Sequence, residues 1–332
     1  MHVQVVKTIV ATEDIRDWDR CVAILQAEAD VKIVAHAPGL MELFSLVERD
    51  PPQLVLISAR LARLPEFDLM VTLFREFDVR WLSFERSMPA HQREQRPSLR
   101  TSGLFSLPID GNPQMVVDQI RSVLRARHSV APAPELRAIA SKRRYRRLVL
   151  IGASTGGIDA LRTVLGHFGS DCPPTVIVQH ISEGFGRNLA STLSRGCAAK
   201  VLSFEPDLEL GSGMVCIVAG LSHHVVLAPS YRPVLTASHE PAMSGHRPSI
   251  DRIFLSAVPF APRIVAAVMT GMGRDGAEGL LALRRAGAQT LAQDEASSVV
   301  YGMPGAAWAN GGATQQVALR DLGPTLLAEA QR

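Results

Sequence analysis

The sequence is poor in cysteine and in aromatic residues, which make up 5% of the chain. Its four cysteines lie far apart, at positions 21, 172, 197 and 216 of 332 residues. None of them forms the CxxC spacing of a zinc site, and their isolation does not suit a disulfide framework. Such cysteine usage is typical of a reducing compartment, so we expect a cytoplasmic protein with no structural metal.

Targeting and membrane signals are also missing. The amino terminus has no positively charged segment followed by an apolar core, so we expect no signal peptide. No apolar run approaches the length of a membrane-spanning helix, so we expect no membrane insertion. The net charge of +3 is small and scattered, with no basic face interleaved with aromatic residues, which argues against a nucleic-acid partner.

Residues 1–125 alternate short apolar runs with amphipathic stretches. This alternation predicts a parallel sheet with helices on both faces, and the flavodoxin-like order is the commonest such fold of this size. Strands are predicted at 3–10, 31–34, 54–57, 79–82 and 104–107, and helices at 15–28, 39–48, 66–75 and 112–125. The last helix has Asn112 as a cap and Pro113 in its first turn.

Residues 126–146 interrupt this pattern and are predicted to link two domains. A Ser/Ala/Pro segment favours an extended chain, and a basic run follows it. The basic residues are Arg137, Lys142, Arg143, Arg144, Arg146 and Arg147. This run is either a solvated charged face or a contact for an acidic partner.

The second domain, residues 147–332, begins with four aliphatic residues, a glycine-rich turn and a helical stripe. Within the turn, Gly152-x-Ser154-x-Gly156 is the pattern that places a serine on a sharp turn between strand and helix. Backbone amides there could stabilise the negative charge that develops when Ser154 attacks a carbonyl. A phosphate-binding loop or a simple helix cap is the alternative, although no lysine follows the glycines.

The rest of this domain is also predicted to be α/β. Buried strands are expected at 175–179, 264–269 and 290–293, the last being the final strand, and a meander at 201–204, 215–218 and 223–227. Helices are expected at 185–193, 249–258, 304–310 and 320–331, with another ending at residue 285.

Three reactive side chains, Ser154, His180 and Asp275, follow predicted strands of this domain. Functional groups gather at the carboxyl ends of parallel strands. If the strands are neighbours, His180 takes the proton of Ser154, and Asp275 orients and stabilises the imidazole. The alternatives are a core histidine at position 180 and a capping box formed by Asp275 with Glu278.

The other histidines of this domain lack a comparable setting in the sequence. They are His167, His223, His224, His239 and His246. In a strand, neighbouring His223 and His224 would point to opposite faces, which weakens a metal interpretation.

Six stretches of the second domain carry a resemblance to a known family. They are 152–157 (GASTGG), 178–180 (VQH), 245–251 (GHRPSID), 270–276 (TGMGRDG), 291–296 (LAQDEA) and 301–304 (YGMP). In this order they resemble the chemotaxis protein-glutamate methylesterases (CheB-type), also described as glutamine deamidases of receptors. The resemblance extends over nearly all of residues 147–320.

The resemblance implies a doubly wound α/β methylesterase domain that needs no metal or organic cofactor. It implies hydrolysis of glutamyl methyl esters on the cytoplasmic helices of chemoreceptors, with release of methanol and, as a further activity, glutamine deamidation. Ser154, His180 and Asp275 occupy the positions of the family's catalytic serine, histidine and aspartate. Further partners are expected among chemotaxis kinases and scaffold proteins. The rival hypothesis is a non-enzymatic signalling adaptor that keeps the fold.

The oxyanion donors are predicted separately, from the glycines of two loops. The backbone amides of Thr155 or Gly156, with that of Met272, are the candidates, because glycine lets both loops approach one carbonyl.

The family normally carries an amino-terminal receiver domain, and residues 1–125 have that layout without its chemistry. Ser58 stands where the phosphoacceptor aspartate is expected, and Leu107 replaces the lysine. Glu13 and Asp14 are an imperfect metal-binding pair, and Ser83 stands at the switch hydroxyl. We expect a pseudo-receiver without phosphorylation that covers the catalytic cleft or binds a partner. The alternative is a purely stabilising domain.

Overall fold

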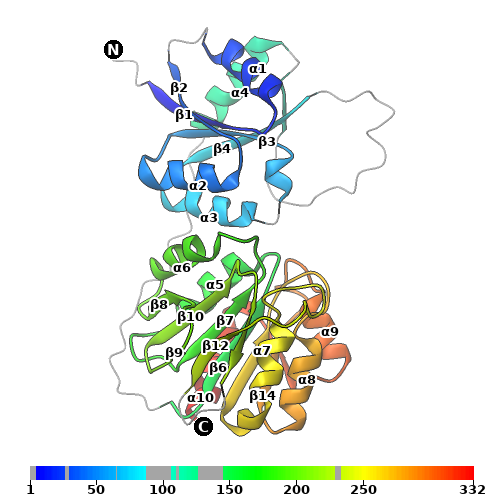
Figure 1. The fold of residues 1–332 in the computed structure, drawn as a ribbon. Coiled ribbons are helices and arrows are strands. Elements are labelled where there is room, and N and C mark those ends of the chain that lie inside the picture. Colours follow the sequence, from blue (N-terminus) through cyan, green and yellow to red (C-terminus); the bar gives the residue numbers. More distant parts are fainter. Residues whose placement is uncertain are drawn as a thin grey trace. The chain divides into compact units, whose positions relative to one another are not determined.

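The computed structural model describes residues 5–26, 30–64, 66–86, 106–109, 112–125, 145–228 and 233–332. They belong to two compact units, Met1–Ala131 and Pro132–Arg332 (Figure 1). The predicted linker at 126–146 lies outside the described residues except for Tyr145 and Arg146. In the described part of the chain, no helix is both long enough and apolar enough to span a membrane.

The first unit is a parallel five-stranded sheet in the order β2-β1-β3-β4-β5, which confirms the flavodoxin-like prediction. Its strands are β1 (Val6–Ala11), β2 (Val31–Ala37), β3 (Leu54–Ser58), β4 (Arg80–Glu85) and β5 (Ser106–Pro108). Its helices are α1 (Ile15–Leu25), α2 (Leu40–Arg49), α3 (Phe67–Glu76) and α4 (Pro113–Arg125), with a 3₁₀ turn η1 (Leu61–Arg63).

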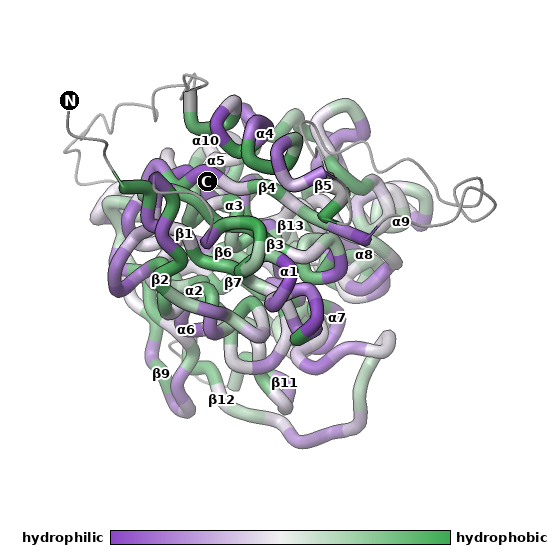
Figure 2. Tube along the Cα trace, turned by 90° about the horizontal axis from the view of Figure 1, so that it is seen from above, coloured by the Kyte–Doolittle hydropathy of each residue, from purple (hydrophilic) through white to green (hydrophobic). Residues whose placement is uncertain are grey.

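The helices of this unit are amphipathic because each packs one face on the sheet. In Figure 2, α1 and α4 alternate between hydrophobic and hydrophilic colours along their length. Asn112 caps α4 as predicted, since its side-chain oxygen accepts a hydrogen bond from the amide of Gln114 at 3.0 Å. Strand β3 is buried on both faces, as expected for a central parallel strand.

The second unit is built on a parallel seven-stranded sheet in the order β15-β14-β13-β6-β7-β10-β8. Its strands are β6 (Leu148–Ala153), β7 (Thr175–Gln179), β8 (Lys200–Ser203), β10 (Met214–Ala219), β13 (Ile264–Val268), β14 (Gln289–Gln293) and β15 (Gln315–Val317). A separate antiparallel sheet contains β9 (Leu208–Glu209), β11 (His224–Leu227) and β12 (Val234–Ser238).

Two groups of helices pack with this sheet. One group is α5 (Gly157–Leu165), α6 (Gly186–Ser194) and α10 (Leu319–Gln331), and the other is α7 (Ile250–Ser256), α8 (Ala277–Arg285) and α9 (Met303–Ala309). A further 3₁₀ helix, η3 (Val258–Arg263), leads into β13. Alternate residues of β6, Leu148 and Leu150, share a buried cluster with Phe254 of α7 and Leu280 of α8. The fold is therefore doubly wound, as predicted.

Two expectations for the second unit are wrong. Strands β8, β10 and β11 do not form a meander, because β8 and β10 pair in parallel within the main sheet and β11 pairs with β12. Strand β10 is almost entirely buried, which suits a central parallel strand rather than a half-exposed hairpin. Strand β14 is not the last one, since β15 follows it, and the polar sequence of β15 suits a sheet edge that apolar patterning does not detect.

The chain changes direction at β6. From β6 it runs through β7 towards β8 and β10, and it then crosses to the other side of β6 to form β13, β14 and β15. The carboxyl ends of β13, β6 and β7 are consequently neighbours at a topological switch point, where open α/β sheets place their sites.

Candidate active site

Ser154 follows directly on the central strand β6. Its amide donates to the carbonyl of Thr270 at 3.0 Å, and its own carbonyl accepts from the amide of Gly157 at 2.8 Å. Gly156, with φ of +74°, closes the turn and caps α5. The structure thus contains the strand, turn and helix predicted from the sequence, and it holds the serine at their junction.

His180 lies beside Ser154 on the adjacent strand. Gln179 is in register with Ala153, and the amide of His180 donates to the carbonyl of Ala153 at 3.0 Å. The imidazole Nε2 is 2.9 Å from Oδ2 of Asp275, which arrives from the far side of β6 after β13. Nδ1 of His180 is buried and has no hydrogen-bond partner among the described residues.

Asp275 is the most heavily hydrogen-bonded side chain of the group. Besides His180, its carboxylate accepts from the hydroxyl of Ser249 at 2.8 Å and from the amides of Ile250 at 2.8 Å and Asp251 at 3.0 Å. Burial alone would raise the pKa of Asp275, but the hydrogen bonds from His180 and from these amides outweigh it and hold the pKa below its usual value. Asp275 is therefore an anion that faces the imidazole.

The capping-box alternative for Asp275 is wrong. Helix α8 is capped by Gly276 without any side-chain hydrogen bond, and Glu278 instead pairs with Arg274 at 3.4 Å on the surface. The carboxylate of Asp275 turns away from α8 to bind the first turn of α7 and His180.

A second buried carboxyl group, Asp251, lies next to Asp275. Burial raises the pKa of Asp251 to about 6, and the charge of Asp275 also raises it, while a hydrogen bond from the amide of Gly279 opposes the shift. In the sequence, Asp251 stands out only as the last residue of the stretch 245–251. Its spacing from Asp275 gives no signal that the two carboxyl groups meet.

Two buried polar residues brace the loops of the site. The amide Nε2 of Gln179 donates to the carbonyls of Ser154 at 2.8 Å and His180 at 3.0 Å. The hydroxyl of Thr270 donates to the carbonyl of Thr155 at 2.9 Å. The backbone on both sides of the serine is thus fixed by side chains as well as by strands.

The loop after β13 approaches Ser154 very closely. A Cβ atom on Gly271 would lie 2.7 Å from the Cβ of Ser154, so only glycine fits there. Met272 follows, and the structure therefore brings the loops of Thr155, Gly156 and Met272 together around the serine. The amides of Thr155 and Met272 make no hydrogen bond to another described residue. The side chain of Met272 is 75% exposed.

His246, which its sequence context does not mark as a site residue, also belongs to this site. The ring of His246 stacks on that of His180, with centroids 3.9 Å apart and planes inclined by 10°. The expectation that His246 lacks a comparable setting is therefore wrong. Over the described ranges, no group of three or more His, Cys, Asp or Glu residues is arranged to hold a metal ion.

Comparison with known proteins identifies the family. Residues 149–326 match the sequence model of the family described as CheB methylesterase, which is more than half of the chain. The chain belongs to the CheB methylesterase family. The family predicted from the six stretches is confirmed, and with it a carboxylic-ester hydrolase of the serine type.

Relatives match this chain over both of its units. A protein-glutamate methylesterase/protein-glutamine glutaminase of Agrobacterium fabrum is 32% identical and covers 92% of this chain and 91% of its own. One from Bordetella bronchiseptica is 34% identical, with 92% and 91% covered. The crystal structure of the Thermotoga maritima CheB methylesterase catalytic domain aligns with a TM-score of 0.53 at 27% identity, over 55% of this chain and 97% of that one.

The turn at Gly156 yields a first prediction for this methylesterase. Gly156→Val should lower turnover by a factor on the order of a hundred, the scale of one lost oxyanion donor. Its φ of +74° disfavours any side chain, and a Cβ there would lie 2.6 Å from the Cβ of Val299. Turnover of the folded variant is the measurement. Gly196→Val is the matched control, since Gly196 has nothing within 4 Å of its Cβ position. Full turnover of Gly156→Val would contradict the prediction that this turn supplies an oxyanion donor.

In the first unit, a buried hydroxyl group stands at the position where the phosphoacceptor aspartate of a receiver is expected. Ser58 ends β3, is 5% exposed and donates to Oε2 of Glu13 at 3.0 Å. Glu13 also pairs with Arg60 at 3.0 Å. Asp14 caps α1 through the amide of Arg16, and Leu107 is buried.

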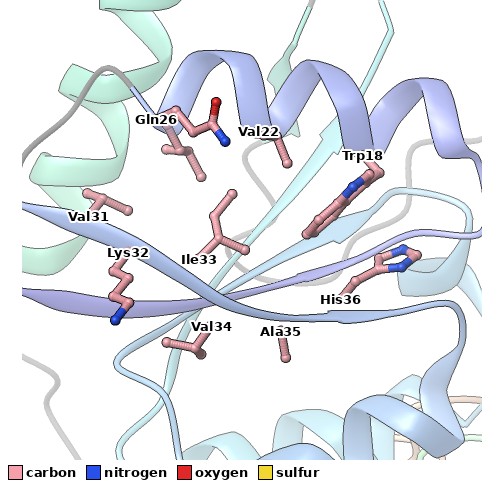
Figure 3. Close-up of a pocket in the computed structure, with 10 residues that line it drawn as sticks. Trp18, Val22, Gln26, Val31, Lys32, Ile33, Val34, Ala35 and His36 are labelled. Carbon is pink, nitrogen blue, oxygen red and sulfur yellow. The ribbon is translucent and has the colours of Figure 1, made fainter.

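The first unit also contains a largely apolar cavity of about 520 Å³ between α1 and the edge strand β2. Figure 3 shows the indole of Trp18 beside the imidazole of His36, whose ring centroids are 4.6 Å apart. None of the residues that line this cavity belongs to the site around Ser58.

Proposed function

We propose that this chain hydrolyses glutamyl methyl esters on the cytoplasmic helices of chemoreceptors, with Ser154, His180 and Asp275 as its catalytic triad. The observation that carries this proposal is the hydrogen bond of His180 to Asp275 through one ring nitrogen, with the other nitrogen unpaired at the strand end next to Ser154. That arrangement leaves the lone pair of the second ring nitrogen available to take a proton from a serine nucleophile.

The tautomer follows from the hydrogen bonds. Asp275 is an acceptor only, so Nε2 of His180 carries a hydrogen and Nδ1 carries a free lone pair. Nδ1 takes the proton from the hydroxyl of Ser154 as its oxygen attacks the ester carbonyl. The carboxylate of Asp275 stabilises the imidazolium that forms.

The rest of the reaction uses the same groups in reverse. The imidazolium returns its proton to the methoxide oxygen, methanol leaves, and an acyl-enzyme on Ser154 remains. Water, deprotonated by His180, then attacks the acyl group and releases the glutamate carboxylate. The amides of Thr155 and Met272, with Gly156 shaping the turn, bind the oxyanion in both steps.

Deamidation of receptor glutamine follows the same route. Attack of Ser154 on the side-chain amide gives the same acyl-enzyme, with ammonia as the leaving group in place of methanol. The relatives from A. fabrum and B. bronchiseptica carry both activities in their names. We propose both activities for this site.

Methanol release from methylated receptor membranes by the purified protein tests the proposal. We expect release that depends on protein concentration and on Ser154. Chemotaxis kinases and scaffold proteins are proposed as further partners, to be tested by co-purification. Binding of receptor membranes without any methanol release would instead favour the non-enzymatic adaptor.

The first unit is proposed to act without phosphorylation. A receiver requires a carboxylate nucleophile, an acidic cluster for Mg²⁺ and a lysine. Here Ser58 is buried against Glu13, Asp14 is occupied as a helix cap, and Leu107 is apolar.

Incubation with acetyl phosphate and Mg²⁺ should therefore leave both the mass of the protein and its esterase turnover unchanged. An unactivated, buried hydroxyl is a poor nucleophile. Intact-mass spectrometry before and after incubation is the measurement. A stable species one phosphoryl group heavier, mapped to residue 13, 14 or 58, would show the prediction to be wrong.

A further inference from the structure

The ring of His246 covers one face of the catalytic imidazole without joining the hydrogen bonds of the triad. Its centroid lies 3.9 Å from that of His180, and the two planes are nearly parallel. We infer that His246 is a positioning residue that holds the ring plane of His180 in line with Ser154 and shields the imidazolium formed during catalysis. This inference rests on the proposed serine mechanism.

The segment that carries His246 is anchored at both ends by a buried histidine of β11. His224 is fully buried, its Nε2 lies 2.9 Å from the carbonyl of Pro241, and its Nδ1 accepts from the amide of Ser249 at 3.2 Å. Between these anchors, Met243 and His246 exchange two backbone hydrogen bonds of 2.9 and 3.2 Å. The place of His246 is therefore set by the backbone.

His180 needs such a neighbour because its ring has one side-chain anchor among the described residues, the 2.9 Å bond from Nε2 to Asp275. A ring held at one nitrogen can tilt about that bond. A flat neighbour at stacking distance opposes the tilt, since either sense of rotation drives an edge of the imidazole into it. The ring of His180 is thereby held in one orientation at the end of β7, the strand that pairs with β6.

The charge state of His246 suits this position. Burial lowers the pKa of His246, and the charge that His180 can carry lowers it further, while Asp275 opposes the shift. His246 is therefore neutral at pH 7. A neutral ring presents its π-electron face to the imidazolium of His180 and attracts that charge. With this ring in place, the side chain of His180 is 9% exposed.

Two substitutions of His246 test whether its ring positions His180. One removes the ring, and the other replaces it by a different planar ring. His246→Ala should lower kcat on the order of tenfold, the scale of a desolvated cation–π contact, with KM close to that of the parent. His246→Phe should keep most of kcat, because phenylalanine retains the planar surface. His239→Ala, which removes an exposed histidine just before the same segment, is the control and should keep full activity.

Two readouts are needed, methanol release and the rate at which a fluorophosphonate labels Ser154. The labelling rate follows the competence of His180 as a base without any receptor substrate. Labelling slowed in His246→Ala and restored in His246→Phe supports the inference, provided that both variants keep the parent's melting temperature.

Unchanged labelling and kcat in His246→Ala would overturn the inference. So would a loss in His246→Phe as large as in His246→Ala, because an imidazole nitrogen and not the ring plane would then be required. Failure of the proposed receptor substrate looks different: the parent protein would label normally and release no methanol.

Discussion

Ser154→Ala is expected to reduce methanol release by about a thousandfold or more, and His180→Ala by a similar factor. The first change removes the attacking oxygen. The second leaves the hydroxyl without a base, because the unpaired Nδ1 of His180 is the acceptor that the site offers at this strand end. Removing both side chains together should cost little more than removing one, since the two act as a unit.

Steady-state methanol release from methylated receptor membranes measures this effect. Ser194→Ala is the matched control, because Ser194 lies exposed at the end of α6 and its hydroxyl donates to the carbonyl of Ser191 in the same helix. The control should keep full turnover. Near-normal methanol release by Ser154→Ala would rule out the serine mechanism, regardless of the results for the other variants.

Asp275→Asn is expected to lower turnover on the order of a thousandfold and to destabilise the fold as well. Asparagine keeps one acceptor oxygen and replaces the other by an NH₂ group. That group would face donors, since the two carboxylate oxygens together accept from Ser249, Ile250, Asp251 and His180. With the NH₂ group at the position of Oδ2, His180 loses its acceptor and adopts the wrong tautomer.

The loss of stability should be about 1–3 kcal/mol, the penalty for leaving a buried donor unsatisfied. Urea unfolding and turnover should be measured on the same preparation. Asp321→Asn is the control, because Asp321 lies exposed on α10 and pairs with Arg320. A stable Asp275→Asn protein with normal turnover would remove Asp275 from the triad.

Much of this fold could be predicted because apolar residues recur in patterns that report local structure. The continuous burial of β6 and the stripe of α5 are visible in the sequence, and so is the glycine turn between them. Strand β15 is not visible in the sequence, because its residues, Gln-Gln-Val, contain no apolar run. The neighbours of β10 are not visible either, because the pairing of a strand depends on tertiary packing and not on its own residues.

The residues of the site also fall into those that the sequence predicts and those that it does not. Ser154, His180 and Asp275 could be proposed together because each follows a predicted strand, and carboxyl ends of parallel strands meet. His246 and Asp251 follow no strand of the main sheet, and their contacts depend on how the segment before α7 folds back over the sheet. No spacing rule connects His246 with His180, because the path between them includes the whole antiparallel sheet.

With the proposed triad, the crossing of the chain at β6 also sets the point during synthesis at which esterase activity can first be expected. His180 and Asp275 are 95 positions apart, and at roughly 5–20 residues per second the ribosome needs about ten seconds to pass from one to the other. For most of that interval the nascent chain carries Ser154 and His180 but neither Asp275 nor the complete strand β13, which borders β6. On the proposed triad, an unfinished or truncated chain that ends before β13 is therefore expected to have no esterase activity.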